Sequence, residues 1–348
     1  MSLYEFFKRS SADLAVDLGT ANTVVFVRGR GIVFTEPSVV ALETVGGVTS
    51  VRAVGDDAKL MLGKTPDNVR TVRPLRNGVI ADIEVAEQMI KYFIRKAQGG
   101  RRGLASSRPE IVICVPSGST QVERRAIREA VTQAGARKVW LIDEPMAAAI
   151  GAGLPINEPI GSMVVDIGGG TTEVGIITVQ GLAMTMSVRV GGDRMDDAII
   201  ASVRRTHNLI IGEATAERVK KEFGAAWIEE GQEPVTASIR GRDVTRGVPR
   251  EIQVDQAELV AALAEPVSQI VQAVRAALEN TAPEIAADII DAGIVMTGGG
   301  SLLKGIDKVL ADATGLPVCI AENPLDCVAL GAGRALEDDG YRGVLHAA

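Results

Sequence analysis

The chain has 348 residues, of which 46% are hydrophobic and 23% charged, and its formal net charge is −7. This length and apolar content suffice for two domains or one large one, and the acidic balance argues against general nucleic-acid binding. The chain contains only two histidines, which argues against a histidine metal cluster or a catalytic triad.

The three cysteines, Cys114, Cys319 and Cys327, form no CxxC array, and each lies in or beside an apolar stretch. We therefore expect buried free thiols and a reducing cytosol, not disulfides or zinc. No run of about 18 uncharged apolar residues occurs, so the sequence predicts no membrane-spanning helix.

The first half alternates strand-like and helix-like segments, which predicts βαβ units with a parallel component in the sheet. Asp82 is expected to cap the helix at 84–98, and Ser119 or Thr120 the helix that ends at Ala134. The expected strands are 13–18, 23–27, 31–42, 111–115 and 139–142, with a tight turn at 19–22 between the first two. A loop is expected at 98–109. A short helix of small residues begins at Asp143-Glu144-Pro145.

The second half repeats the opening pattern. Residues 162–179 again read as an apolar strand, an aspartate, a glycine turn and a β-branched strand. Helices are expected at 192–206, 215–223 and 256–280, and a strand at 294–296 leads into another glycine turn at 297–301. The polar stretch 229–250 is expected to contain little strand and to belong to a small subdomain.

Three glycine turns thus follow apolar strands, and two of them carry an aspartate at the same place, Asp17 and Asp166. Glycine turns at strand ends present backbone N–H groups to phosphates. Two aspartates facing each other across a cleft suit a hydrated Mg²⁺ on a nucleotide. Taken singly, each turn reads better as a tight hairpin and each aspartate as the cap of its own turn. The three together favour a phosphate site.

Other nucleotide motifs are absent. The sequence has no GxxxxGK[ST] P-loop, no GxGxxG opening a helix after the first strand, and no kinase HRD or DFG set.

The motifs DLGTAN (17–22), DIGGGTTE (166–173) and TGGGSLL (297–303), in this order, resemble the actin superfamily of ATPases. Within it, the chain is similar to the MreB family of bacterial actin homologues over nearly its whole length. The residues that carry this similarity are EPSVVAL (36–42), ICVPSG (113–118), RRAIREA (124–130), DEPMAAAIGAGLP (143–155), ATAERVKKEFG (214–224) and GRDVTRGVPRE (241–251).

The resemblance implies an α/β, actin-like fold with two related ribonuclease H-like domains flanking a nucleotide cleft. Domain I is expected at 1–154 plus 323–348, with a small subdomain near 36–74. Domain II is expected at 155–322, with a small subdomain near 189–254.

The resemblance also implies a site for ATP or ADP with Mg²⁺, in which Asp17 and Asp166 hold the hydrated metal. The residues expected to bind the nucleotide are Thr20, Ala21, Asn22, Gly168, Gly169, Gly170, Glu217, Lys220, Gly299, Gly300, Ser301 and Leu302. Glu144 and Thr171 are expected to be catalytic, because Glu144 stands where actin has a water-orienting Gln. Glu144 can also be read as a carboxylate favoured by the helix dipole. Actin's phosphate-loop lysine has no counterpart in 20–25.

The implied function is a slow, assembly-coupled ATPase that forms filaments, with paired protofilaments, and directs cell-wall elongation and rod shape. Two alternatives on the same fold remain: the ATPase part of a heat-shock-type chaperone, and a sugar or acetate kinase. A chaperone needs a further substrate-binding domain, and a kinase needs an acceptor pocket with a catalytic Asp.

The implied location is cytoplasmic, at the inner face of the cytoplasmic membrane, with membrane proteins of cell-wall elongation as partners. Leu3, Phe6 and Phe7, followed by Lys8 and Arg9, are expected to form a short interfacial anchor. The loop at 98–109 is the second candidate for membrane contact, and a frayed terminus is the competing interpretation.

Overall fold

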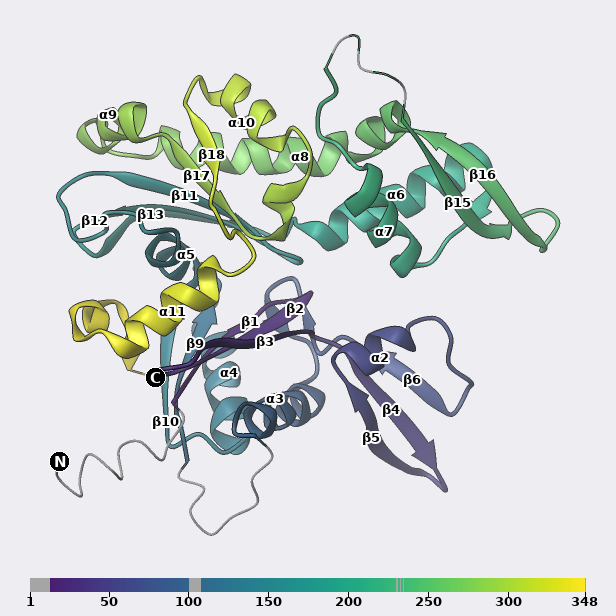
Figure 1. Cartoon of the computed structure of the whole chain (residues 1–348), viewed down its shortest axis with the longest axis horizontal. Helices are drawn as coiled ribbons and strands as arrows, with labels where there is room; N and C mark the ends of the chain where they lie inside the picture. Colours follow the sequence, from purple (N-terminus) through teal and green to yellow (C-terminus); the bar gives the residue numbers. More distant parts are fainter. Residues whose placement is uncertain (1–12, 100–107, 230, 232, 234, 348) are drawn as a thin grey trace.

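The computed structural model describes residues 13–99, 108–229, 231, 233 and 235–347. Two lobes lie one above the other in Figure 1, and each is built on its own mixed sheet. In lobe I, the apolar strand β1 (Leu14–Leu18) pairs antiparallel with the next strand and parallel with a later one. In lobe II, β11 (Ser162–Ile167) does the same. The repeat in the sequence is therefore a repeat of the fold.

Lobe I has helices on both faces of its sheet, because successive side chains of β1 point to opposite faces. Leu14 and Val16 pack toward α3 and α4, whereas Ala15 packs toward α5 and α11. The sheet order is β19 (His346–Ala347), β10 (Lys138–Asp143), β9 (Glu110–Val115), β1, β2 (Asn22–Val27) and β3 (Gly31–Pro37). The helices are α3 (Ile83–Ala97), α4 (Gln121–Gln133), α5 (Glu144–Ala152) and α11 (Cys327–Glu337), and a 3₁₀ turn follows at η2 (Asp339–Val344).

The predicted helix starts in lobe I are confirmed. The Asp82 side chain accepts a hydrogen bond from the backbone N–H of Val85 at 3.1 Å. Thr120, not Ser119, caps α4, and its hydroxyl exchanges hydrogen bonds with Glu123 in a capping box. Each cap satisfies backbone donors that the helix itself leaves unpaired.

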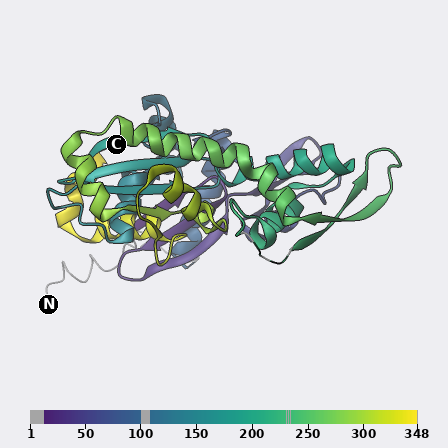
Figure 2. The same cartoon turned by 90° about the horizontal axis from the view of Figure 1, so that it is seen from above.

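Lobe II packs its sheet against the long helix α8 (Gln256–Glu279), which Figure 2 shows reaching from the main sheet to the outer hairpin. The sheet order is β13 (Gly181–Val188), β12 (Thr172–Thr178), β11, β17 (Ile294–Thr297) and β18 (Val318–Ile320). Other helices near this sheet are α9 (Pro283–Ala292), the 3₁₀ helix η1 (Gly299–Leu302) and α10 (Ile306–Thr314).

Helices α5 and α11 lie between the two sheets in Figure 1, and their backbones approach closely. A Cβ atom on Gly151 would lie 1.8 Å from the carbonyl oxygen of Cys327, and one on Gly331 would lie 1.8 Å from that of Ala147. Only glycine fits at such a crossing. The C-terminal part of the chain thereby returns to lobe I, where β19 pairs with β10.

Each lobe carries a smaller sheet at the right-hand end of Figure 1. Lobe I adds β5 (Val48–Val54), β4 (Val40–Val45) and β6 (Val69–Val72), with α2 (Asp56–Leu60) and the ladder β7 (Leu75–Arg76) with β8 (Val79–Ile80). Lobe II adds β14 (Leu209–Ile210), β15 (Thr236–Asp243) and β16 (Pro249–Asp255), with α6 (Gly192–His207) and α7 (Glu213–Phe223).

The expectation that residues 229–250 contain little strand is wrong. β15 lies within this stretch and forms a seven-pair antiparallel hairpin with β16, which begins at its end, at Pro249. One face buries Ala237, Ile239 and Val254, and the other carries polar and charged side chains in solvent. The exposed face made the segment read as polar, although alternation of this kind is typical of a half-buried strand.

The prediction of buried thiols is correct for Cys114 and Cys327 and wrong for Cys319, which is exposed. Cys319 lies in β18, an edge strand that pairs only with β17. Over the described ranges, none of the helices combines the length and the apolar composition needed to cross a bilayer.

Candidate nucleotide site

The second and third glycine turns pack against each other at the ends of two parallel strands. β11 and β17 are paired with Asp166 opposite Thr297, and the Thr297 hydroxyl donates to Asp166 Oδ1 at 2.7 Å. Gly298 has φ 77°, and a Cβ there would lie 2.4 Å from the carbonyl oxygen of Ile167. A side chain would be strained at that φ and would also push the two turns apart.

The first and second glycine turns, one from each lobe, are in direct contact. A Cβ on Gly169 would lie 2.6 Å from Ala21 Cβ, and one on Gly170 would lie 2.4 Å from Thr20 Oγ1. The Thr20 hydroxyl accepts a hydrogen bond from the backbone N–H of Gly78 at 3.1 Å. Gly168 is less crowded, with its nearest contact at 3.3 Å. The structure thus brings the predicted phosphate residues of both lobes together.

The third turn, η1, contains the four predicted residues Gly299–Leu302. Its Ser301 hydroxyl donates to the carbonyl oxygen of Gly298 at 2.7 Å, which fixes the turn. A Cβ on Gly300 would lie 2.1 Å from Ile167 Cγ2, so this turn rests on the strand that carries Asp166. Leu302, by contrast, is 55% exposed.

Four carboxyl groups lie near one another beneath the turns: Asp17, Glu144, Asp166 and Glu173. Burial, and then repulsion from Asp166, raises the pKa of Asp17 to about 7. Burial raises the pKa of Asp166 to about 6, although the hydrogen bond from Thr297 opposes this shift. Burial raises the pKa of Glu144 well above its usual value, and Glu173, Asp17 and Asp166 raise it further. Such a cluster favours a bound cation, which would relieve the repulsion.

The donor set of this cluster fits Mg²⁺. Carboxylate oxygens are hard ligands, and Mg²⁺ typically takes one or two of them and fills its other positions with water and phosphate oxygens. In the part of the chain that the structure describes, no three His, Cys, Asp or Glu side chains are grouped so that they enclose an ion by themselves. Asp17 and Asp166 remain the two carboxylates predicted to hold Mg²⁺ on a nucleotide.

Glu144 is the first residue of α5, directly after β10, and it is 8% exposed. Pro145 follows in the first helical turn, where its missing N–H costs nothing. The preceding residue, Asp143, is paired with Arg124, and His346 lies 3.2 Å from its other carboxyl oxygen. These two contacts hold the end of β10 in position. Because Glu144 is the next residue, they also help to position its side chain toward the carboxyl cluster.

The predicted nucleoside residues lie on α7 and already have partners. Lys220 pairs with Asp196 at 2.9 Å and donates to the carbonyl oxygen of Gly192 at 2.8 Å. Glu217 accepts from Lys59 at 2.9 Å and from Lys221 at 2.6 Å. Burial would raise the pKa of Glu217, but these two lysines lower it to about 2.

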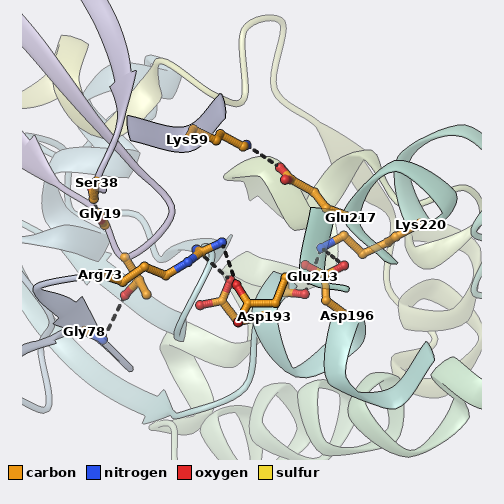
Figure 3. Close-up of polar contacts among 12 residues, drawn as sticks. Gly19, Ser38, Lys59, Arg73, Gly78, Asp193, Asp196, Glu213, Glu217 and Lys220 are labelled. Atoms are coloured by element: carbon orange, nitrogen blue, oxygen red, sulfur yellow. Dashed lines mark hydrogen bonds and ion pairs between the residues drawn. The ribbon is translucent and has the colours of Figure 1, made fainter. Parts of the chain in front are cut away.

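Among the described residues, three ion pairs cross from one lobe to the other beside the turns, and sequence reasoning missed them (Figure 3). Lys59 of lobe I reaches Glu217 of lobe II, and Arg73 of lobe I lies 3.6 Å from Asp193 and 3.5 Å from Glu213. The partners are more than 100 residues apart in sequence, and no local pattern pairs them. These ion pairs hold the smaller parts of the two lobes against each other, and sequence periodicity does not reveal them.

Two repeated lobes, with a strand, glycine turn and strand from each meeting at a shared carboxyl cluster, define an actin-like nucleotide-binding architecture. The family model of the MreB/Mbl protein matches residues 11–341, and the chain belongs to the MreB/Mbl family.

Individual relatives agree with this assignment. The chain is 53% identical over 337 residues to the cell shape-determining protein MreB of Escherichia coli K12, covering 96% of each chain. It is 47% identical to the cell shape-determining protein Mbl of Bacillus subtilis, covering 94% of this chain and 96% of that one.

Solved structures agree with the fold. The structure of MreB5 of Spiroplasma citri bound to AMPPNP matches with a TM-score of 0.86 and 37% identity, over 93% of this chain and 96% of that one. The same protein has also been solved bound to ADP. The double helical filament of MamK, 24% identical, matches with a TM-score of 0.76 over 94% of this chain and 99% of that one, which bears on the fold alone.

Proposed function

We propose that this chain is an ATP-hydrolysing cytoskeletal protein that polymerises into membrane-associated filaments and directs cell-wall elongation and rod shape. The observation that carries the proposal is the contact between the two phosphate turns above a shared carboxyl cluster, in a chain of the MreB/Mbl family. The cytoskeletal role in cell shape is the role named for the relatives at 53% and 47% identity.

ATP and ADP are the proposed ligands, because the MreB5 relative is described with AMPPNP and with ADP. Thr20, Ala21 and Asn22 would contact the phosphates from lobe I, and Gly168–Gly170 from lobe II. Glu217 and Lys220 would face the ribose and adenine, and the turn at Gly299–Leu302 would close over the nucleoside. At Gly169, Gly170 and Gly300 other protein atoms fill the space that a Cβ would take, so these turns carry no side chain there and offer backbone N–H groups for a phosphate.

Hydrolysis requires a water placed in line with the terminal phosphoryl group. Glu144, at the start of α5, would orient that water and accept its proton. Thr171, buried beside the second turn, would help to hold the water. Bound Mg²⁺ would neutralise the phosphate charge. Turnover would be slow in a free subunit and faster on assembly, when the two lobes are held closed.

The proposed domain division follows the two lobes. Domain I would comprise 1–154 and 323–348, with the small sheet β5-β4-β6 as its subdomain. Domain II would comprise 155–322, with the small sheet β14-β15-β16 as its subdomain. The return of α11 and β19 to lobe I supports the assignment of the C-terminal segment to domain I.

The function is tested by ATP-dependent pelleting, with electron microscopy of the pellets with and without lipid vesicles. We expect filaments in ATP that gather on the lipid, and phosphate release that rises with assembly. Monodisperse protein that phosphorylates a sugar or acetate rapidly, or that releases bound peptide on ATP addition, would instead support one of the two alternatives.

The Asp17→Asn variant distinguishes the role of Asp17 in metal binding from its role in the stability of the fold. Because burial raises its pKa to about 7, the Asp17 carboxyl is favoured in its protonated form, and its contribution to stability is lost as pH rises from about 4 to about 7. At pH 8 we therefore expect Asp17→Asn to be at least as stable as the wild type without ligand. It should lose the extra rise in unfolding temperature that Mg²⁺ gives in the presence of ADP.

Thermal unfolding at pH 8, without ligand, with ADP, and with ADP and Mg²⁺, measures these effects. Asp82→Asn is a matched control, because asparagine caps a helix about as well as aspartate and α3 starts away from the cluster. If Mg²⁺ raises the unfolding temperature of ADP-bound Asp17→Asn as much as that of the wild type, Asp17 does not bind the metal.

Membrane association is proposed through the N-terminal segment. Residues 1–12 and 100–107 lie outside the described residues, so both predicted membrane contacts remain predictions. A chain lacking residues 1–9 should lose most of its co-sedimentation with anionic liposomes, because Phe6, Phe7 and two basic residues are removed. If the truncated chain binds liposomes as well as the wild type, the loop at 98–109 is the main membrane contact instead. The partners proposed are inner-membrane proteins of cell-wall elongation.

A further inference from the structure

Glu173 is a buried carboxyl group that receives hydrogen bonds from both lobes. It lies in β12 of lobe II and is 1% exposed. Its Oε2 atom accepts from the backbone N–H of Ser117 at 3.0 Å and from Ser117 Oγ at 2.6 Å, both in lobe I. Its Oε1 atom accepts from Ser187 Oγ of lobe II at 2.5 Å. A carboxylate at this depth is costly unless donors surround it, so the loop after β9 is tied to the sheet of lobe II.

The junction around this carboxyl is tightly packed. A Cβ on Gly118 would lie 2.8 Å from Ser187 Cβ, so the loop after β9 rests directly on β13. A Cβ on Gly78 would lie 2.9 Å from Pro116 Cγ and 2.9 Å from Thr171 Cγ2. The contact between the lobes therefore extends from the surroundings of Glu173 to Thr171, next to the second phosphate turn.

Glu173 also lies close to the residue proposed to orient water. It stands opposite Asp166 in the register of β11 and β12, so both side chains point to the same face. Gly175, two residues further along β12, shares that face, and a Cβ there would lie 2.6 Å from Pro145 Cβ. Pro145 directly follows Glu144. After burial, the Glu173 charge is the largest influence that raises the pKa of Glu144, which places the two carboxyls within electrostatic range.

We propose that Glu173 is a positioning residue that couples closure of the two lobes to the placement of Glu144. In the closed arrangement, Ser117 completes the hydrogen bonds of Glu173, and β12 supports the start of α5. Opening of the lobes would remove the two hydrogen bonds that Glu173 accepts from Ser117 and leave this buried carboxyl with its bond from Ser187. Closure of the lobes and correct placement of β12 would therefore occur together. This inference rests on the proposed ATPase function, in which Glu144 orients the water.

Two serine variants separate this role from simple stabilisation. Ser117→Ala removes a donor that crosses between the lobes, whereas Ser187→Ala removes a donor from within lobe II. We expect Ser117→Ala to lower kcat in filaments about tenfold, with nucleotide affinity within about twofold of wild type, because one hydrogen bond to a charged group is lost. Ser187→Ala should change kcat by less than about threefold. Glu173→Gln should show the same loss of kcat and the same retained nucleotide affinity as Ser117→Ala.

A distance between the lobes gives a readout that does not depend on hydrolysis. Spin labels at Thr49→Cys and Arg246→Cys, in a Cys319→Ser background, report the separation of the two small sheets by double electron–electron resonance. With ADP and Mg²⁺ bound, Ser117→Ala should broaden the distance distribution toward longer values, and Ser187→Ala should not.

Equal effects of the two serine variants, or a wild-type distance in Ser117→Ala, would overturn the proposal. A longer distance with unchanged kcat would also overturn it, because closure would then not be coupled to Glu144. Normal hydrolysis by Glu144→Ala filaments is a separate result, and it would count against the proposed catalytic residue.

Discussion

Glu144→Ala filaments should bind ATP normally and release phosphate at least about a hundredfold more slowly than wild-type filaments. Alanine can neither orient the attacking water nor accept its proton. The side chain is buried at the first turn of α5, and removal of its carboxyl also relieves repulsion within the cluster. Nucleotide affinity should therefore be retained while turnover is lost.

Single-turnover phosphate release, measured on polymers of matched length, checks this expectation. Glu129→Ala is a suitable control, because Glu129 lies on the exposed side of α4, paired with Arg125. Wild-type turnover in Glu144→Ala would assign Glu144 to the other interpretation, a helix-start carboxylate without a catalytic part.

Gly169→Ala should abolish or greatly weaken nucleotide binding, by at least about a hundredfold, because a single methyl group would separate the two phosphate turns. The added Cβ would lie 2.6 Å from Ala21 Cβ and 3.0 Å from the Ala21 backbone nitrogen. The backbone on the opposing turn cannot move aside as a flexible side chain would, so the lobes must separate. The phosphate contacts, which need both turns at once, would then be lost.

Binding of a fluorescent ATP analogue measures this effect. Gly212→Ala is the matched control, because no atom lies within 4 Å of its Cβ position and its φ is −91°. Retained binding by Gly169→Ala would show that the two turns do not need to touch around a nucleotide.

The sequence was sufficient for the repeated core of this fold. Apolar strands that end in Asp-Gly turns predicted β1, β11 and the turn after β17, because these signals are local. The caps at Asp82 and Thr120 were predictable for the same reason. The actin-like fold followed from the motifs in order, and the structural relatives bear it out.

Features that depend on contacts between distant segments could not be predicted in this way. The hairpin β15–β16 was missed because its exposed face carries polar residues that mask the alternation. Lys59 and Glu217 are 158 positions apart, and only the fold brings them together. Ser117 and Glu173 were both within quoted motifs, yet their contact depends on how one lobe packs against the other. The exposure of Cys319 depends on the edge position of β18, which composition does not reveal.

Calorimetric titration of the free protein with ATP, in Mg²⁺ and again in EDTA, tests the central claim most directly. If the two Asp-Gly turns form one nucleotide site, wild-type protein binds one ATP per chain, and binding weakens markedly when Mg²⁺ is removed or when Asp17 is replaced by Asn. The absence of binding, or binding that is indifferent both to Mg²⁺ and to Asp17→Asn, would contradict the account.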